Sequence, residues 1–131
     1  MLLDTSGLMC LFDRRDFRHQ DALDFYNAAS VRLTHNYVLA EFVTLTQVRH
    51  APRAEALAFV VDLFDDPEVE VVWVGELLHQ GALALLQERL DKAWSLCDAV
   101  SFLLMQQGGL TEALTTDHHF EQAGFIKLLK S

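Results

Sequence analysis

Four acidic residues lie in segments that are otherwise apolar, where an unpaired carboxylate is costly to bury. Asp4 follows the run MLL, Glu41 lies within YVLAEFV, Asp98 lies within SLCDAVSFLLM, and Asp117 follows ALTT. Acidic side chains in such surroundings are seldom buried unless they are paired or bind a metal ion. The four acids are therefore the first candidates for a functional site.

Each of these acids also has a purely structural explanation when it is taken singly. Asp4 could accept hydrogen bonds from the N–H groups of the next helix, and Asp117 could cap the short turn that follows it. Asp98 comes three residues after Ser95, which is close to the pattern of a capping box. Glu41 could face solvent on one narrow stripe of its helix. The residues alone leave both interpretations open.

The elements that must position these acids alternate along the chain. Apolar runs predict strands over Met1–Asp4, Val31–Leu33, Val69–Val74, Ala113–Thr116 and Phe125–Leu129. Apolar spacing predicts helices over Ser6–Phe12, His19–Ala29, Asn36–Arg49, Pro52–Phe64, Leu77–Leu90 and Ser95–Gln107, with at most one turn over Phe120–Gln122. Asn36 is a predicted N-cap, and Thr5 or Ser6 is expected near the N-cap of the first helix. This alternation is typical of an α/β fold with a parallel sheet covered by helices on both faces.

This order of elements could bring the four acids to one edge of the sheet. Asp4 and Asp117 end predicted strands, and open parallel sheets bind ligands outside the carboxyl ends of their strands. Glu41 lies about two turns into the helix after the second strand, and Asp98 lies in the first turn of the helix before the fourth. Four such carboxylates would repel one another and force their pKa values apart. No Lys or Arg adjoins any of them, and an all-oxygen set favours Mg²⁺ or Mn²⁺ over zinc.

The composition limits the class of protein. The 131 residues, of which 51% are hydrophobic, predict one domain over residues 1–131 with a substantial core. The net charge of −9 argues against a broad basic surface for nucleic acid, but it allows an acidic site that binds cations. No apolar run reaches the ~18 residues that span a bilayer, and no signal peptide is evident, so a cytoplasmic protein is expected. Cys10 and Cys97 fit no zinc spacing and are predicted to be small buried hydrophobic residues.

The segments around the four acids resemble the PIN-domain ribonucleases and, within that family, the small VapC-type toxins. The resemblance lies in LDTS at 3–6, VLAE at 38–41, LCDAVSF at 96–102, and TTDHHF at 115–120 followed by Gly124. These motifs occur in the family's order and span the whole chain. The resemblance implies a three-layer α/β/α fold whose five-stranded parallel sheet has the order 3-2-1-4-5. It also implies an Mg²⁺- or Mn²⁺-dependent endoribonuclease that acts on RNA, is commonly a homodimer, and is often blocked by a small antitoxin.

The resemblance also implies roles for individual residues. Asp4, Glu41, Asp98 and Asp117 would bind the metal or order water beside it. Ser6 matches the family's hydroxyl two residues after the first acid, and Thr116 could hold the last carboxylate or a water molecule. Hydrolysis by this chemistry would leave a 5′-phosphate and a 3′-hydroxyl.

The remaining polar residues near these motifs are expected to have structural or surface roles. His35 is predicted to be an N-terminal turn residue of its helix rather than a phosphate contact. His118 and His119 are interpreted as structural rather than metal-binding, because adjacent side chains diverge. For five arginines a role in RNA contact is possible, but a solvated surface position is favoured for each singly: Arg14, Arg15, Arg18, Arg49 and Arg53.

Other classes of protein fit these residues less well. A phosphatase of the haloacid dehalogenase type would have a second acid where Ser6 stands, and a receiver domain would have paired acids and a late lysine. No P-loop motif is present. The alternatives that stay open are a PIN fold without catalytic activity, acting as a binding module, and another Mg²⁺-dependent phosphoesterase. The intact set of four acids favours the active enzyme.

Overall fold

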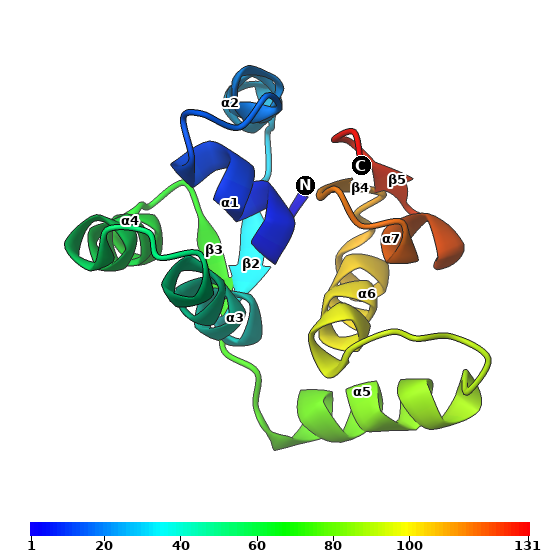
Figure 1. Ribbon diagram of the computed structural model, residues 1–131. Coiled ribbons are helices and arrows are strands. Elements are labelled where there is room, and N and C mark those ends of the chain that lie inside the picture. The colour runs from blue at the N-terminus through cyan, green and yellow to red at the C-terminus, as the bar shows by residue number, and fades with distance from the viewer.

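A parallel sheet of five short strands forms the middle layer of the fold (Figure 1). The computed structural model describes residues 1–131, and the strands are β1 (Leu2–Leu3), β2 (Leu33–His35), β3 (Glu70–Val72), β4 (Glu112–Leu114) and β5 (Ile126–Lys127). Their order is β3-β2-β1-β4-β5, and Leu2 pairs with both Leu33 and Ala113, so β1 is the central strand. The predicted α/β class and strand order are confirmed.

Seven helices cover the two faces of this sheet. They are α1 (Thr5–Phe12), α2 (His19–Ala28), α3 (Asn36–Val48), α4 (Arg53–Asp65), α5 (Glu76–Glu88), α6 (Leu96–Gly108) and α7 (His119–Gln122). Figure 1 shows α1 to α4 on one side of the sheet and α5 and α6 on the other, which gives three layers. None of the helices combines the length and the apolar character needed to cross a bilayer.

The short run MLL supplies the centre of both cores. Successive residues of a strand point to opposite faces, so Leu3 packs in the core under α1 and α3 while Leu2 packs in the core under α6. Both leucines have no exposed surface. Asp4 continues the extended backbone, and its N–H donates to the carbonyl of Leu114 at 3.2 Å. The alternation therefore directs the Asp4 side chain toward the face that α6 covers.

The second strand lies two residues later than the predicted range of 31–33. The pairing of Leu33 with Leu2 extends the ladder to His35, which is paired with Val72 on the other side. The β-branched run that suggested the earlier range is only the approach to the sheet. As a result His35 is both the last residue of β2 and the N-cap of α3, as expected of a residue at the start of this helix, and it is buried.

The N-cap of α3 lies one residue before the predicted Asn36. Asn36 is the first residue of α3, and its Oδ1 instead accepts a hydrogen bond of 2.6 Å from the N–H of Val74. Asp4, rather than Thr5 or Ser6, occupies the N-cap position of α1, but its carboxylate makes no capping hydrogen bond. Capping is therefore not the main role of the Asp4 side chain, although a backbone hydrogen bond from Thr5 helps to lower its pKa.

Gly7 lets α1 pack directly on the sheet. A Cβ at this position would lie 1.9 Å from the carbonyl oxygen of Leu114, which is backbone and cannot move aside. We expect Gly7→Ala to lower the free energy of unfolding by about 3 kcal/mol. The control is Gly81→Ala within α5, where the nearest atom is a Leu103 methyl at 3.4 Å, and where alanine should be neutral or stabilising. Urea denaturation of both variants measures this difference, and equal stabilities would contradict it.

Candidate active site

The four acids come from four different elements and face the carboxyl edge of the sheet between β1 and β4. Asp4 directly follows β1 and is 5% exposed, and Asp98 lies in the first turn of α6 and is 7% exposed. Asp117 follows β4 and is half-buried, whereas Glu41, in the second turn of α3, is exposed. The two most buried of the acids are thus Asp4 and Asp98.

Hydroxyl groups tie Asp4 to the loop after β4. The Thr115 hydroxyl donates to Oδ2 of Asp4 at 2.7 Å and accepts from the N–H of Asp117 at 3.0 Å. The Oγ of Ser6 lies 3.1 Å from the Thr115 hydroxyl and 3.4 Å from Oδ2 of Asp4, and it accepts from the N–H of Thr116 at 3.0 Å. This network fixes the first acid relative to the last and leaves Oδ1 of Asp4 without a hydrogen bond.

The threonine that reaches an acid through its side chain is Thr115, which sequence reasoning did not select. Thr116, predicted for a supporting role, takes part through its backbone N–H alone. The reason is register: Leu3 pairs with Leu114, so the next residues, Asp4 and Thr115, lie side by side and point to the same face. Knowledge of which strands are neighbours was needed to find this residue.

His118 and His119 both turn toward Asp117, so the expectation that their side chains diverge is wrong. Nδ1 of His119 lies 3.0 Å from Oδ2 of Asp98 and 3.4 Å from Oδ2 of Asp117, and Nδ1 of His118 lies 3.6 Å from Oδ1 of Asp117. Asp117 also caps the turn, because its Oδ1 accepts from the N–H of His119 at 2.9 Å. The cap bends the carboxylate back over α7, where it meets both rings. His119 thus bridges two of the four acids.

Asp98 has both of the roles that the sequence allowed. Its Oδ2 accepts from the N–H of Ser95 at 3.0 Å, and its own N–H donates to the Ser95 hydroxyl at 3.0 Å, which completes the capping box. The same Oδ2 faces Nδ1 of His119. Oδ1 makes no hydrogen bond, so the cap holds the side chain in place and leaves one oxygen free for a ligand.

Burial and neighbouring negative charges shift the pKa values of two groups at this edge of the sheet. Burial raises the pKa of Asp4 to about 7, against a partial lowering by the Thr115 hydrogen bond, and the negative charges of Asp98 and Glu41 raise it further. Burial also raises the pKa of the Cys97 thiol well above its usual range, and the charges of Glu41, Asp4 and Asp98 add to this. Glu41 therefore belongs to the cluster although its side chain is exposed. Both cysteines are buried and free, as predicted.

The donor set fits a hard divalent cation. No Lys or Arg forms an ion pair with any of the four acids, and only the two histidines do. A carboxyl buried among like charges favours its protonated form until a cation balances it. Mg²⁺ and Mn²⁺ prefer such oxygen ligands. Asp4, Asp98, Asp117 and Glu41 can therefore hold one of these ions.

His35 lies beside Asp4 on the next strand but belongs to the core. Its Nε2 lies 2.8 Å from the hydroxyl of Ser101 in α6, and its Nδ1 is buried without a hydrogen-bond partner. Burial lowers its pKa to about 4, so the ring is neutral at physiological pH. A phosphate contact by His35 is therefore excluded, because the side chain has no exposed surface.

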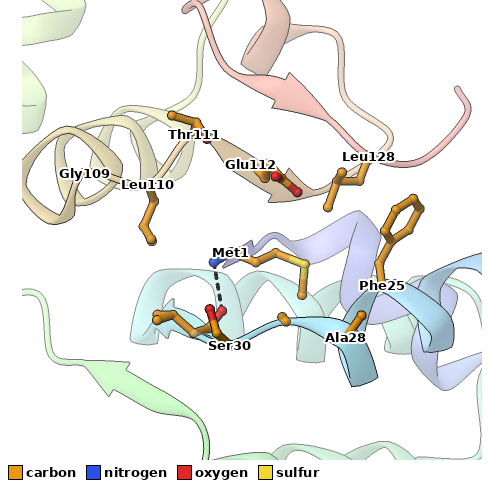
Figure 2. A pocket seen from close by; sticks show the side chains of 11 residues that line it. Met1, Phe25, Ala28, Ser30, Gly109, Leu110, Thr111, Glu112 and Leu128 are labelled. Carbon is orange, nitrogen blue, oxygen red and sulfur yellow. Dashed lines mark hydrogen bonds between the residues drawn. The ribbon is translucent and has the colours of Figure 1, made fainter.

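A cavity of about 350 Å³ lies at the opposite end of the sheet, where β1 and β4 begin (Figure 2). Its lining includes Met1, Phe25, Glu112 and Leu128, and the Met1 ammonium donates to the carbonyl of Val31 at 2.8 Å. None of the four acids lines this cavity. The candidate active site is therefore the acidic edge of the sheet and not the cavity.

The hydroxyl network gives a testable difference between two adjacent threonines. Thr115→Val removes the hydrogen bond that holds Asp4, and we expect it to slow RNA cleavage about 10–100-fold, the usual effect of losing an outer contact to a metal ligand. Thr116→Val keeps the backbone N–H that donates to Ser6, so its rate should stay close to that of the wild type. Cleavage rates at saturating Mg²⁺ provide the measurement. A larger loss in Thr116→Val than in Thr115→Val would contradict this account of the network.

The chain belongs to the PIN-domain family, because the family model for the PIN domain matches residues 1–126.

Within that family it is similar to the 23S rRNA-specific endonuclease VapC20 of two Mycobacterium tuberculosis strains. The sequences are 31% identical over 129 residues, which cover 98% of this chain and 97% of the relative. The crystal structure of Mycobacterium tuberculosis VapC20, described as a Sarcin-Ricin loop cleaving toxin, has a TM-score of 0.88 at 29% identity and covers 98% of both chains. A toxin–antitoxin complex from Klebsiella pneumoniae shares the fold, with a TM-score of 0.68 at 18% identity over 99% of this chain and 98% of the other.

Proposed function

We propose that this protein is an Mg²⁺- or Mn²⁺-dependent endoribonuclease of the VapC toxin type, with residues 1–131 acting as one PIN domain. One observation carries the proposal: acids from four separate elements face one edge of the sheet, and no Lys or Arg forms an ion pair with them. The PIN family and the similarity to a named endonuclease support the reaction class.

In this proposal each side chain has a distinct task. Asp4 is the central ligand, with Oδ2 held by Thr115 and Oδ1 free to bind. Asp98 and Asp117 would be further ligands of the ion, and His119 sets their relative positions from 3.0 and 3.4 Å. Glu41, the exposed acid, orients the attacking water. The bound ion supplies positive charge that activates this water and stabilises charge on the phosphate.

Contacts to RNA must come from a few local cations, because the net charge is −9. Arg15 and Arg18 are paired with Asp13 and Asp16, at 3.5 and 2.9 Å. Three further arginines are exposed and form no ion pair: Arg14, Arg49 and Arg53. Arg14 and Arg49 follow the C-terminal ends of α1 and α3, away from the acidic edge, so we expect recognition to rest chiefly on the shape of a structured RNA.

The first substrate to test is large ribosomal RNA, which the similar endonuclease is named for. Purified protein and 23S rRNA are incubated with Mg²⁺ or with EDTA, and the new ends are mapped by primer extension. We expect a small number of cuts with 5′-phosphate ends that appear with Mg²⁺ and disappear with EDTA. Fragments that form equally in EDTA would contradict metal-dependent cleavage.

We also propose that the protein forms a homodimer. Four large apolar side chains on α4, after β3 and on α5 are between 47% and 86% exposed and would be covered in a dimer: Val61, Phe64, Trp73 and Leu77. Phe64 and Trp73 pack edge to face at 6.0 Å, so part of this surface is already ordered. Sedimentation equilibrium at micromolar concentration should give twice the chain mass of 14.8 kDa. A single species at the chain mass would contradict a dimer.

A small antitoxin is the second proposed partner. The acidic edge could accept an arginine that replaces the positive charge of the metal, which would block the site. The test is the reading frame next to the gene: co-expression of the small protein encoded there should abolish cleavage of 23S rRNA. Full activity in a purified complex of the two proteins would contradict inhibition of this kind.

A further inference from the structure

The motif after β4 brings together three metal-ligating side chains that the acidic site does not fully use. Asp117, His118 and His119 each offer a ligand atom, and these atoms all lie within 4.8 Å of one another. The two rings lie 4.7 Å apart between centroids, one on the N-cap residue of the short helix α7 and the other on its first residue. This cluster contains two imidazoles, whereas the set around Asp4 consists of carboxylates.

The distances within this cluster are close to those of a tetrahedral site. Ligand atoms bound to zinc at 2.0–2.1 Å lie about 3.4 Å from one another. Oδ2 of Asp117 is already 3.4 Å from Nδ1 of His119, and its Oδ1 is 3.6 Å from Nδ1 of His118. His118 must move toward His119 and Oδ2 of Asp117, and its side chain is 66% exposed and free to turn. A small rotation of one side chain would complete a three-ligand site with a position left for water.

We propose that Asp117, His118 and His119 form a second metal site that binds Zn²⁺ and inhibits the enzyme when it is occupied. Imidazole nitrogen together with a carboxylate suits zinc, while the all-oxygen set of the acidic site suits Mg²⁺. The two sites share Asp117, so zinc withdraws one carboxylate from the acidic cluster.

Zinc binding also breaks the bridge between two acids. Nδ1 of His119 lies 3.0 Å from Oδ2 of Asp98, and a nitrogen that binds zinc cannot keep this hydrogen bond. Asp98 then loses the contact that sets its position relative to Asp117. The inhibitory effect rests on the proposed nuclease function, whereas zinc binding itself does not.

The binding test uses the purified full chain and Zn²⁺ in competition with a chromophoric chelator, in a background of excess Mg²⁺. We expect one Zn²⁺ per chain and at least about 10-fold weaker binding in His118→Ala. The matched control is His50→Asn, because His50 is another exposed histidine and asparagine tolerates its positive φ of 56°. Equal zinc affinities in His118→Ala and the wild type, or no zinc binding by the wild type, would overturn the proposal.

The inhibition test measures RNA cleavage at fixed Mg²⁺ against increasing Zn²⁺, with each protein normalised to its own rate without zinc. The zinc concentration for half-inhibition should rise at least about 10-fold in His118→Ala and stay at the wild-type value in His50→Asn. Inhibition at the same concentration in all three proteins would overturn the inhibitory site. If no protein cleaves RNA but His118→Ala still loses zinc affinity, the nuclease proposal fails and the zinc site stands.

Discussion

Replacing Asp4 with asparagine is expected to abolish RNA cleavage, with a loss of about 10³-fold in rate. The amide cannot supply the negative charge that binds the cation, while it keeps the size and shape of the carboxyl group. Oδ1 of Asp4 is the oxygen left free by the hydroxyl network, and Oδ2 accepts from Thr115 at 2.7 Å. The asparagine side-chain oxygen can still accept this bond, so the fold should be retained. Asp98→Asn should act in the same direction.

The control for this loss is Asp62→Asn, which makes the same chemical change at an exposed position of α4. Single-turnover cleavage of 23S rRNA at saturating Mg²⁺ gives the rates, and circular dichroism verifies that each variant is folded. We expect Asp62→Asn to match the wild type. A folded Asp4→Asn protein that cleaves at close to the wild-type rate would remove Asp4 from the site.

The same substitution is expected to stabilise the metal-free protein at neutral and alkaline pH. Burial raises the pKa of Asp4 from 3.8 to about 7, so between these values the folded state holds a proton that the unfolded state releases. The contribution of Asp4 to stability is therefore greatest below about pH 4 and falls as the pH rises toward 7. The total loss is about 4 kcal/mol. Asp4→Asn removes this loss.

His35 changes the stability of the folded state in the opposite direction as the pH rises, over a range that overlaps that of Asp4. Burial lowers its pKa from 6.5 to about 4, so its contribution is full above about pH 6.5 and is lost as the pH falls toward 4. The pH profile of the wild type alone therefore combines both effects. The difference between the wild type and Asp4→Asn isolates Asp4, because both proteins contain His35.

Urea denaturation in EDTA at pH 5 and pH 8 measures this difference. We expect Asp4→Asn to be more stable than the wild type at pH 8, with a smaller gap at pH 5. Addition of Mg²⁺ at pH 8 should stabilise the wild type and leave Asp4→Asn unchanged, since the cation favours the ionised carboxyl. If Asp4→Asn were less stable than the wild type at pH 8, this would contradict a pKa of Asp4 that is raised by burial and by neighbouring negative charges.

The architecture was predictable because it depends on patterns that are local in the sequence. Apolar runs of strand length alternate with helical spacing, and right-handed crossovers then require a parallel sheet. The placement of Asp4 and Asp117 at strand ends follows from the same patterns, and the structure puts both there. The strand order itself came from the family resemblance, because alternation alone is compatible with more than one order.

The features that were missed depend on contacts between distant parts of the chain. Thr115 holds Asp4 because β1 and β4 are neighbours in a particular register, which residue spacing does not specify. The range of β2 was shifted for the same reason, so the burial of His35 at the end of this strand was not predicted. His119 reaches Asp98 because the Asp117 cap bends the start of α7, and this local geometry overrides the usual divergence of adjacent side chains.

The central claim is that Asp4, Asp98 and Asp117 hold a divalent cation at the carboxyl edge of the sheet. Crystals of the wild-type protein soaked in Mn²⁺ test it most directly, because the anomalous scattering of manganese locates the ion without reference to activity. The account predicts a strong peak in contact with the free Oδ1 atoms of Asp4 and Asp98. A map without a peak there, or with manganese bound only at His118 and His119, would contradict it.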